Sequence, residues 1–209
     1  MQFQIIPVTA FQENCSIIWC ETTKQAVLVD PGGDAEIIKE NVAKQNVTIT
    51  KILITHGHLD HVGAAKILAD FYQVKIYGPN EQDQFLLNDL PDQGMRFGLP
   101  LVPSFNPDVW LNEGDQIQVG EIRLDVLHCP GHTPGHIVFI NHADKVAFVG
   151  DVLFKNSIGR TDFPRGNYED LIASITQKLL PLGDDYHFVS GHGPMSTFGV
   201  ERKSNPFLI

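Results

Sequence analysis

Residues 56–61 read His-Gly-His-Leu-Asp-His, and no other stretch constrains the fold of this chain as strongly. They follow a short apolar run and precede a segment with a helical pattern, and a loop held between two such elements can fix side chains that the loop alone could not. His56 and His58 are two positions apart, so they point the same way in an extended backbone. Asp60 and His61 follow where the chain turns. This loop therefore offers two ligands to each of two metal ions, and each ion needs further ligands from elsewhere.

Other histidine and aspartate residues come soon after three later apolar runs, where strands are predicted to end. They are His132, Asp151 and His192. Strand ends that meet at one edge of a sheet sandwich would bring them to the loop at 56–61, and a carboxylate can bridge two ions because it has two oxygens. The candidate ligands divide into two groups and one bridging residue. The first group is His56, His58 and His132, and the second group is Asp60, His61 and His192. Asp151 is the bridging residue.

The composition is typical of a soluble globular protein, with 43% apolar and 19% charged residues. A length of 209 residues suits one domain, residues 1–209. The net charge of −10 disfavours nucleic acid and anionic membranes as partners. Three cysteines do not indicate a disulfide framework, and neither a signal peptide nor a membrane-spanning run is recognisable. We therefore expect a cytoplasmic protein, with a monomer as the default oligomeric state.

Local patterns outside the histidine loops lead to further structural predictions. Asp30 precedes a Pro-Gly-Gly break, and we predict that it caps this turn rather than takes part in catalysis. Asp34 is predicted to be the N-cap of a helix of about ten residues, whose apolar stripe includes Ile37. Residues 80–112 form the least regular segment, because Pro91 and later prolines and glycines break any long element. Such a segment serves either as a substrate wall or as a surface loop.

Four stretches together resemble the metallo-β-lactamase superfamily and, within it, the glyoxalase-II-like hydrolases. They are residues 29–33, 55–63, 128–136 and 159–166. The likeness runs from near the N-terminus to Asn205 and is greatest to the short bacterial type. It implies an α+β fold, an αββα sandwich of two mixed β-sheets flanked by helices. It also implies the ligand groups described above.

The resemblance implies a metal-dependent hydrolase of glutathione thioesters, which converts S-D-lactoylglutathione to D-lactate and glutathione. Two ions about 3.5–4 Å apart can share a water molecule and lower its pKa, so that hydroxide attacks the carbonyl carbon. Asp60 and Asp151 are the catalytic carboxylates in this scheme. Histidine and carboxylate ligands suit zinc, iron and manganese, and of these we expect zinc. Longer glyoxalase II enzymes carry a C-terminal helical region that holds glutathione. Only 17 residues follow His192, so we expect that region to be missing.

Other reactions remain open at this point. A mononuclear-iron persulfide dioxygenase shares the Gly-Arg-Thr-Asp-Phe loop at 159–163, although the complete second ligand group argues against it. Hydrolysis of a lactone or of another thioester would use the same nucleophile. A β-lactamase is disfavoured because those enzymes lack the bridging Asp151, and RNA cleavage is disfavoured by the acidic charge. A metal-stabilised binding module is disfavoured because a structural zinc site is closed and four-coordinate.

Residues near the candidate ligands receive supporting roles. Arg160 and Arg165 are predicted to meet an anionic substrate, with a structural ion pair as the alternative. Asp162 is predicted to orient Arg160 or a ligand histidine. His136 is predicted to support the ligands from behind, and Cys129 to pack as a small hydrophobe.

Overall fold

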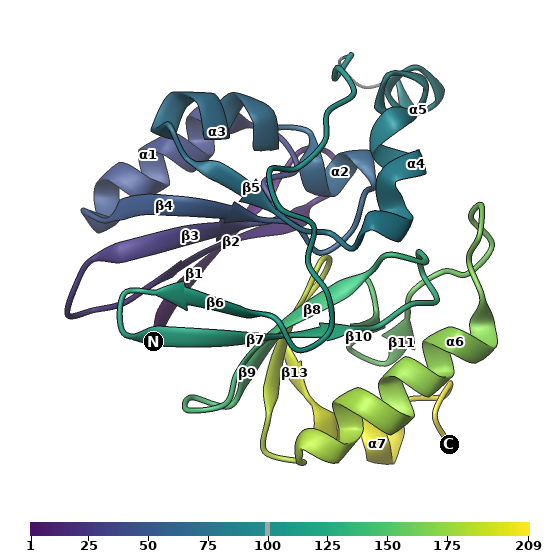
Figure 1. The fold of residues 1–209 in the computed structure, drawn as a ribbon. Coiled ribbons are helices and arrows are strands. Elements are labelled where there is room, and N and C mark those ends of the chain that lie inside the picture. Colours follow the sequence, from purple (N-terminus) through teal and green to yellow (C-terminus); the bar gives the residue numbers. More distant parts are fainter. Residues whose placement is uncertain (99–100) are drawn as a thin grey trace.

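The computed structural model describes residues 1–98 and 101–209, so residues 99 and 100 of the irregular segment lie outside the described part (Figure 1). Two β-sheets pack face to face, and helices cover the outer face of each sheet (Figure 1). Both sheets contain parallel and antiparallel pairs. The αββα sandwich of two mixed sheets that the sequence predicts is thereby confirmed.

The first sheet has the strand order β1-β2-β3-β4-β5. Pairing is antiparallel from β1 to β3 and parallel from β3 to β5. Two helices lie on its outer face, at the top of Figure 1. The elements of this half are β1 (Gln2–Val8), β2 (Glu13–Trp19), β3 (Gln25–Val29), α1 (Ala35–Gln45), β4 (Thr48–Leu53), α2 (Leu59–Val62), α3 (Ala65–Tyr72) and β5 (Lys75–Tyr77).

The second sheet has the order β13-β12-β9-β8-β7-β6, and only β9 and β12 pair in parallel. Helices α6 and α7 cover its outer face (Figure 1). The elements of this half are β6 (Gln116–Val119), β7 (Ile122–His128), β8 (Ile137–Asn141), β9 (Val146–Gly150), the hairpin of β10 (Leu153–Phe154) and β11 (Ser157–Ile158), α6 (Tyr168–Ala173), the π-helical η2 (Ser174–Leu179), the 3-10 turn η3 (Leu180–Leu182), β12 (His187–Ser190), β13 (Ser196–Thr197) and α7 (Phe198–Ser204).

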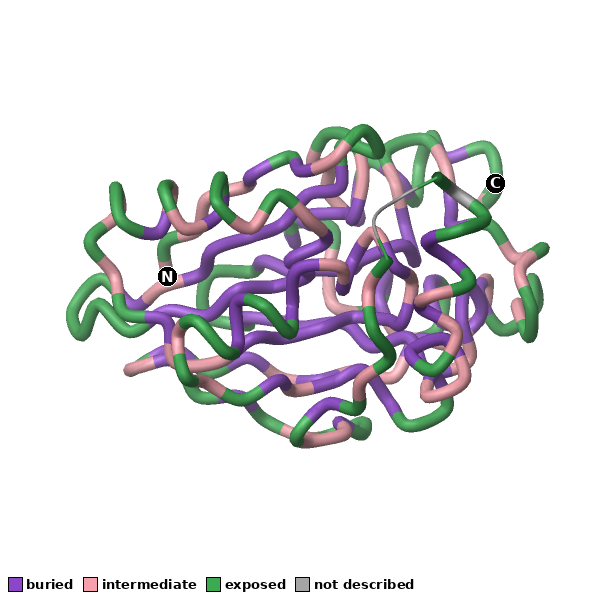
Figure 2. Tube along the Cα trace, turned by 90° about the horizontal axis from the view of Figure 1, so that it is seen from above, coloured by how far each residue is buried: buried purple, intermediate pink, exposed green. Residues whose placement is uncertain are grey.

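Three layers of apolar side chains hold the sandwich together. Val27 and Phe139 belong to the layer between the sheets, Ile38 and Leu68 to the layer under α1 and α3, and Phe188 to the layer under α6. Figure 2 shows the buried strands running through the middle of the molecule. Because both faces of β8 and β9 are buried, these strands read as continuous apolar runs.

Asp34 is the N-cap residue of α1, as predicted, but it does not cap the helix with its side chain, and the prediction for Ile37 is wrong. The helix begins after Asp34, but this residue has a left-handed backbone with φ 47° and makes no side-chain cap. Its Oδ2 instead accepts a hydrogen bond from the Thr9 amide at 2.6 Å, which ties the helix start to the end of β1. Ile37 is 47% exposed, whereas Ile38 and Val42 face the sheet. The apolar stripe is therefore narrower than predicted.

The irregular segment between β5 and β6 contains more helix than its prolines and glycines suggest. It forms η1 (Glu81–Asp83), α4 (Gln84–Asn88) and α5 (Leu90–Phe97). Pro91 lies in the first turn of α5, where the missing amide hydrogen costs no helical hydrogen bond. The helix ends before Gly98, which adopts φ 66°.

Candidate metal centre

The strand directions bring the predicted ligands to one edge of the sandwich. Strands β7, β9 and β12 run the same way, so their carboxyl ends lie at a common edge of the second sheet. Backbone hydrogen bonds join this edge to the first sheet, from Ile137 N to Thr55 O at 2.9 Å and from Asn14 N to Gly191 O at 2.7 Å. The loops that follow β4, β7, β9 and β12 therefore meet at one place.

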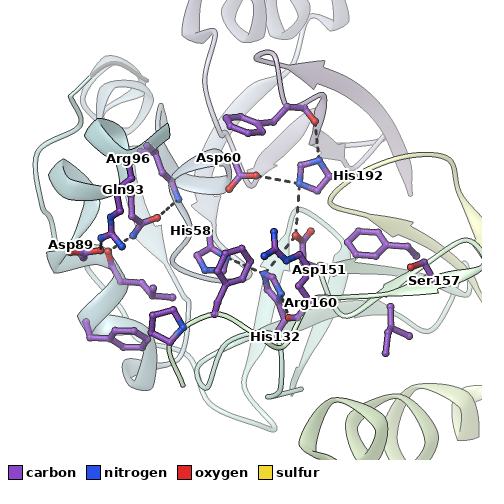
Figure 3. A pocket seen from close by; sticks show the side chains of 18 residues that line it. His58, Asp60, Asp89, Gln93, Arg96, His132, Asp151, Ser157, Arg160 and His192 are labelled. Carbon is purple, nitrogen blue, oxygen red and sulfur yellow. Dashed lines mark hydrogen bonds and ion pairs between the residues drawn. The ribbon is translucent and has the colours of Figure 1, made fainter. Parts of the chain in front are cut away.

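Both predicted ligand groups assemble there. His56, His58 and His132 place potential ligand atoms within 4.8 Å of one another, and so do Asp60, His61 and His192. A third overlapping set contains Asp30 with His56 and His61. Figure 3 shows the cavity-facing members of these groups turned toward one another.

Asp151 lies between the two groups, as the bridging role requires. Its Oδ2 is 3.7 Å from His132 Nε2 and 3.8 Å from His192 Nε2. Its Oδ1 is 3.4 Å from His61 Nε2. One carboxylate thus approaches a nitrogen of the first group and two of the second, and each oxygen faces a different part of the cluster.

The cluster contains buried polar atoms that only an outside partner would satisfy. His56 Nε2, His61 Nε2 and Asp151 Oδ1 have no hydrogen-bond partner among the described residues. Buried polar atoms are normally paired, because an unpaired one costs the free energy of its lost hydration. Two nitrogens and a carboxylate oxygen left open at one place suit divalent metal ions, so these residues fit the metal centre that the sequence predicts.

The remaining ring nitrogens are held from outside. The Nδ1 atoms of His132 and His192 lie 2.8 Å from Arg160 O and 3.1 Å from Phe11 O. His56 Nδ1 lies 3.0 Å from Thr55 Oγ1. A carbonyl partner places the ring hydrogen on Nδ1 and leaves the Nε2 lone pair free, which orients the ring for metal binding.

Asp30 has a larger role than the predicted turn cap. Its Oδ2 lies 3.0 Å from His61 Nδ1 and accepts the Thr55 hydroxyl at 2.5 Å, while Oδ1 accepts the Thr55 amide at 2.7 Å. The carboxylate is buried and orients His61 within the ligand cluster. The prediction of a capping role alone is wrong. The Pro-Gly-Gly pattern indicates a turn at Asp30 but gives no sign of its contact with His61, which lies 31 positions away in the sequence.

The protonation states differ between the two ligand groups. In the second group burial lowers the pKa values of His61 and His192, but the nearby carboxylates of Asp60 and Asp151 outweigh it and raise both, so a metal ion there would displace protons.

The first group already has the protonation states that favour metal binding. Burial, reinforced by the neighbouring His132, lowers the pKa of His58 to about 3, and burial also lowers the pKa of His56. Burial alone would raise the pKa of Asp151, but the facing imidazoles of His61 and His132 hold it well below its usual range. Neutral imidazoles and ionised carboxylates are the forms that bind metal.

Several polar residues around the ligands carried no local sequence signal. Glu13 is fully buried, and neither of its carboxyl oxygens has a hydrogen-bond partner among the described residues, although Oε1 lies 3.8 Å from His61 Nδ1. Burial raises the pKa of Glu13 well above the usual range. Asn14 donates to Ser190 O and Gly193 O at 3.0 and 2.8 Å, which holds the loop of His192. In the sequence, the one sign of a role for Glu13 and Asn14 is that these two polar residues begin an otherwise apolar strand.

A cavity of about 780 Å³ opens onto the ligand cluster. Helices α4 and α5 form one wall, and the β10–β11 hairpin with the loop at 160–164 forms another (Figure 3). Phe85, Phe154 and Phe163 supply much of its apolar lining. The irregular segment of the sequence is thus a cavity wall, the first of its two predicted roles.

The two predicted substrate arginines lie in different places. Arg160 lines the cavity, pairs with both oxygens of Asp162 at 2.9 and 2.7 Å, and lies 4.4 Å from the Phe163 ring. Arg165 lies over the Phe85 ring at 4.2 Å and is not among the described residues that line the cavity. The structure therefore brings Arg160, but not Arg165, to the cavity surface.

Two further predictions agree with the geometry. His136 is buried, its ring stacks on His56 at 4.6 Å, and its Nε2 accepts the Asp151 amide at 3.1 Å, so it supports ligands from behind. Cys129 is buried, and burial raises the pKa of its thiol to about 12. The Cys129 side chain therefore packs as an apolar group.

The fold and site together define a metal-dependent hydrolase, with a face-to-face sheet sandwich that gathers histidine and aspartate at one edge beside a large cavity. The family model described as the metallo-beta-lactamase superfamily matches residues 8–192. The chain belongs to the metallo-β-lactamase superfamily. A protein from Haemophilus influenzae named hydroxyacylglutathione hydrolase GloC is 54% identical over 209 residues, which cover 100% of this chain and 98% of the relative.

Solved structures with similar folds carry different functional names. BLEG-1, titled a B3 metallo-beta-lactamase, has a TM-score of 0.92 at 36% identity and covers 99% of both chains. TTHA1623 in a di-iron-bound form has a TM-score of 0.89 at 33% identity, covering 98% of this chain and 100% of its own. ETHE1 from Myxococcus xanthus has a TM-score of 0.80 at 28% identity, covering 99% and 84%. One of these similar structures thus holds two irons, and the three structures have different functional names. Within the described residues, no helix is long and apolar enough to cross a membrane.

Proposed function

We propose that this protein hydrolyses a glutathione thioester, with S-D-lactoylglutathione converted to D-lactate and glutathione. The observation that carries the proposal is the pair of ligand groups that share Asp151 and open onto one cavity. The relative from H. influenzae is named a hydroxyacylglutathione hydrolase and supports the same reaction. The proposal treats residues 1–209 as one catalytic domain.

The proposed centre would hold two divalent ions, and Asp151 could provide one carboxylate oxygen to each. Its first and second ligand groups are His56, His58 and His132, and Asp60, His61 and His192. Zinc is the first candidate for both ions, and the di-iron form of TTHA1623 makes iron the second. When bound, such a pair supplies a water that is nucleophilic near neutral pH and polarises the substrate carbonyl.

The chain's own residues divide the remaining work. His58, Asp60, His132, Asp151 and His192 line the cavity, so an acyl group can reach them, whereas His56 and His61 are fully buried and hold the centre from behind. Phenylalanine side chains on the cavity wall exclude water from the acyl group. The departing thiolate is a weak base, so the cavity needs no strong general acid for this substrate.

Persulfide oxidation by a single iron is the second candidate function, because the Gly-Arg-Thr-Asp-Phe loop at 159–163 resembles that of persulfide dioxygenases. A one-ion reaction needs only one ligand group, whereas here Asp60, His61 and His192 gather as closely as the first group. This second group favours hydrolysis.

A panel of initial rates, with metal content measured on the same sample, tests the proposal. The substrates are S-D-lactoylglutathione, other acyl thioesters, a homoserine lactone, glutathione persulfide and a cephalosporin. Oxygen consumption is followed with the persulfide, and the cephalosporin is included because the fold is similar to that of BLEG-1. We expect the largest kcat/KM for the glutathione thioester and close to two metal ions per chain. Oxygen consumption with one iron per chain would contradict the proposal, as would preferential cephalosporin or lactone hydrolysis.

Arg160 is proposed to meet a carboxylate of the glutathione moiety, and Arg160→Gln is expected to raise KM while kcat stays near its original value. The effect is limited to about five-fold, because the side chain is 66% exposed and already paired with Asp162. Arg123→Gln is the matched control, since Arg123 pairs with Asp125 at the same sequence spacing and is 57% exposed away from the cavity. Equal KM values for the Arg160 variant and this control would remove Arg160 from the substrate site.

A further inference from the structure

Asp83 is a buried carboxylate outside both ligand groups, yet it contacts the two loops that supply the first group. Its Oδ2 accepts hydrogen bonds from the Gly57 amide at 3.0 Å and the Thr133 hydroxyl at 2.7 Å. Its Oδ1 accepts the Gly135 amide at 2.6 Å. Gly57 lies between His56 and His58, and Thr133 follows His132. One side chain thus connects the backbone of both loops.

The close fit of the glycines is a second, independent observation. A Cβ atom on Gly57 would lie 2.8 Å from Leu86 Cβ and 3.2 Å from Asp83 O. A Cβ atom on Gly135 would lie 2.5 Å from Asp83 N and 2.7 Å from Asn80 O. The segment from η1 to α4 therefore presses against both loops at positions where only glycine leaves room.

Further contacts fix the position of this segment. The Asn80 amide donates to Gly135 O at 3.0 Å. Gln93 accepts the Leu59 amide with Oε1 and donates from Nε2 to Leu86 O, at 3.0 and 2.9 Å. The segment that carries Asp83 is thus anchored to both the histidine loops and the cavity wall.

We propose that Asp83 is a positioning residue that sets the distance between the His56–His58 loop and the His132 loop, and so sets metal affinity at the first group. The proposal rests on the ligand assignment under the proposed function. The second group draws its outer contacts from Asp30 and Phe11 and none from Asp83, so its affinity is independent of Asp83. The two ions should therefore respond differently to a change at this residue.

Asp83→Asn is the direct test, because it keeps the size of the side chain. An amide has one acceptor oxygen and an NH₂ group, so one of the two glycine amides loses its acceptor and faces a donor. We expect the affinity of the first group to fall about 10- to 100-fold, the range found when residues behind metal ligands are changed. Thr133→Val removes one of the three hydrogen bonds, and we expect a smaller fall in the same direction.

Single-site backgrounds separate the two ions. His192→Ala leaves the first group intact, and His58→Ala leaves the second, so zinc binding to each is measured by competition with a chelator. Asp83→Asn should weaken zinc binding in the His192→Ala background and leave it unchanged in the His58→Ala background. Asp70→Asn is the matched control, because Asp70 is exposed on α3 and, among the described residues, its carboxylate pairs with Lys66 alone.

The outcomes separate this proposal from the proposed function. Equal weakening in both backgrounds, with a lower melting temperature of the metal-free protein, would mean a general structural role and would overturn the proposal. Unchanged zinc affinity in the His192→Ala background would also overturn it. If the parent protein binds only one zinc ion, the two-ion function fails, while the affinity of that ion in Asp83→Asn still decides the role of Asp83.

Discussion

Asp151→Ala is expected to lower kcat/KM for the glutathione thioester on the order of 10³-fold or more, since even one oriented donor in a catalytic site is worth 10²–10³-fold. The carboxylate approaches His132 and His192 with one oxygen and His61 with the other. Its loss removes a ligand from both ions at once. Asp30 also lies near His56 and His61, but its oxygens already accept the Thr55 amide and hydroxyl and face His61 Nδ1, so it cannot replace Asp151.

The fold is expected to survive this substitution. The Asp151 amide still donates to His136 Nε2, because that bond uses the backbone. Removing a carboxylate also reduces repulsion with Asp60, which lies in the same cluster. The far-ultraviolet circular dichroism and elution volume should therefore match the parent protein.

Steady-state kinetics with measured metal content tests this prediction. Asp185→Ala serves as control, because Asp185 is exposed and pairs with Lys145 at the opposite end of β9. The control should retain parental kcat/KM. Wild-type hydrolysis by the Asp151 variant would refute the two-ion mechanism.

The positions of the candidate ligands could be predicted where a histidine or aspartate follows the end of a strand. His132, Asp151 and His192 each come soon after a strand whose apolar residues mark it in the sequence, and parallel directions bring such ends together. The two-sheet sandwich was implied by the family resemblance and not by the strand pattern. The helical pattern of residues 35–45 was less informative. That pattern wrongly predicted that Ile37 faces the sheet, because the rotation of a helix about its axis depends on how its side chains pack.

Two of the residues that support the candidate ligands, Asp30 and Asp83, could not be predicted in the same way. Asp30 and Asp83 act through partners 31 and 50 positions away, namely His61 and Thr133. A lone aspartate at a turn has the same local pattern whether it caps that turn or orients a distant ring. Only the packed structure, which brings the irregular segment against the histidine loops, distinguishes the two roles.

Removal of the metal ions is expected to lower the melting temperature by about 8–16 °C. A ligand present at about 1,000 times its Kd stabilises the folded state by about 4 kcal/mol, and each kcal/mol shifts the melting temperature by about 2–4 °C at this chain length. The site makes this coupling strong, because the carboxylates of Asp60 and Asp151 lie in one cluster with Asp30 behind them. Divalent ions offset the repulsion among these carboxylates.

Thermal unfolding at buffered free zinc concentrations measures this coupling. The melting temperature should rise with free zinc only above the Kd, because only the folded chain gathers the ligands. His58→Ala should keep part of the shift through the second group, whereas Asp151→Ala should lose most of it because both groups are incomplete. A melting temperature independent of zinc would exclude tight binding at these ligands, since any ion that prefers the folded state must stabilise it.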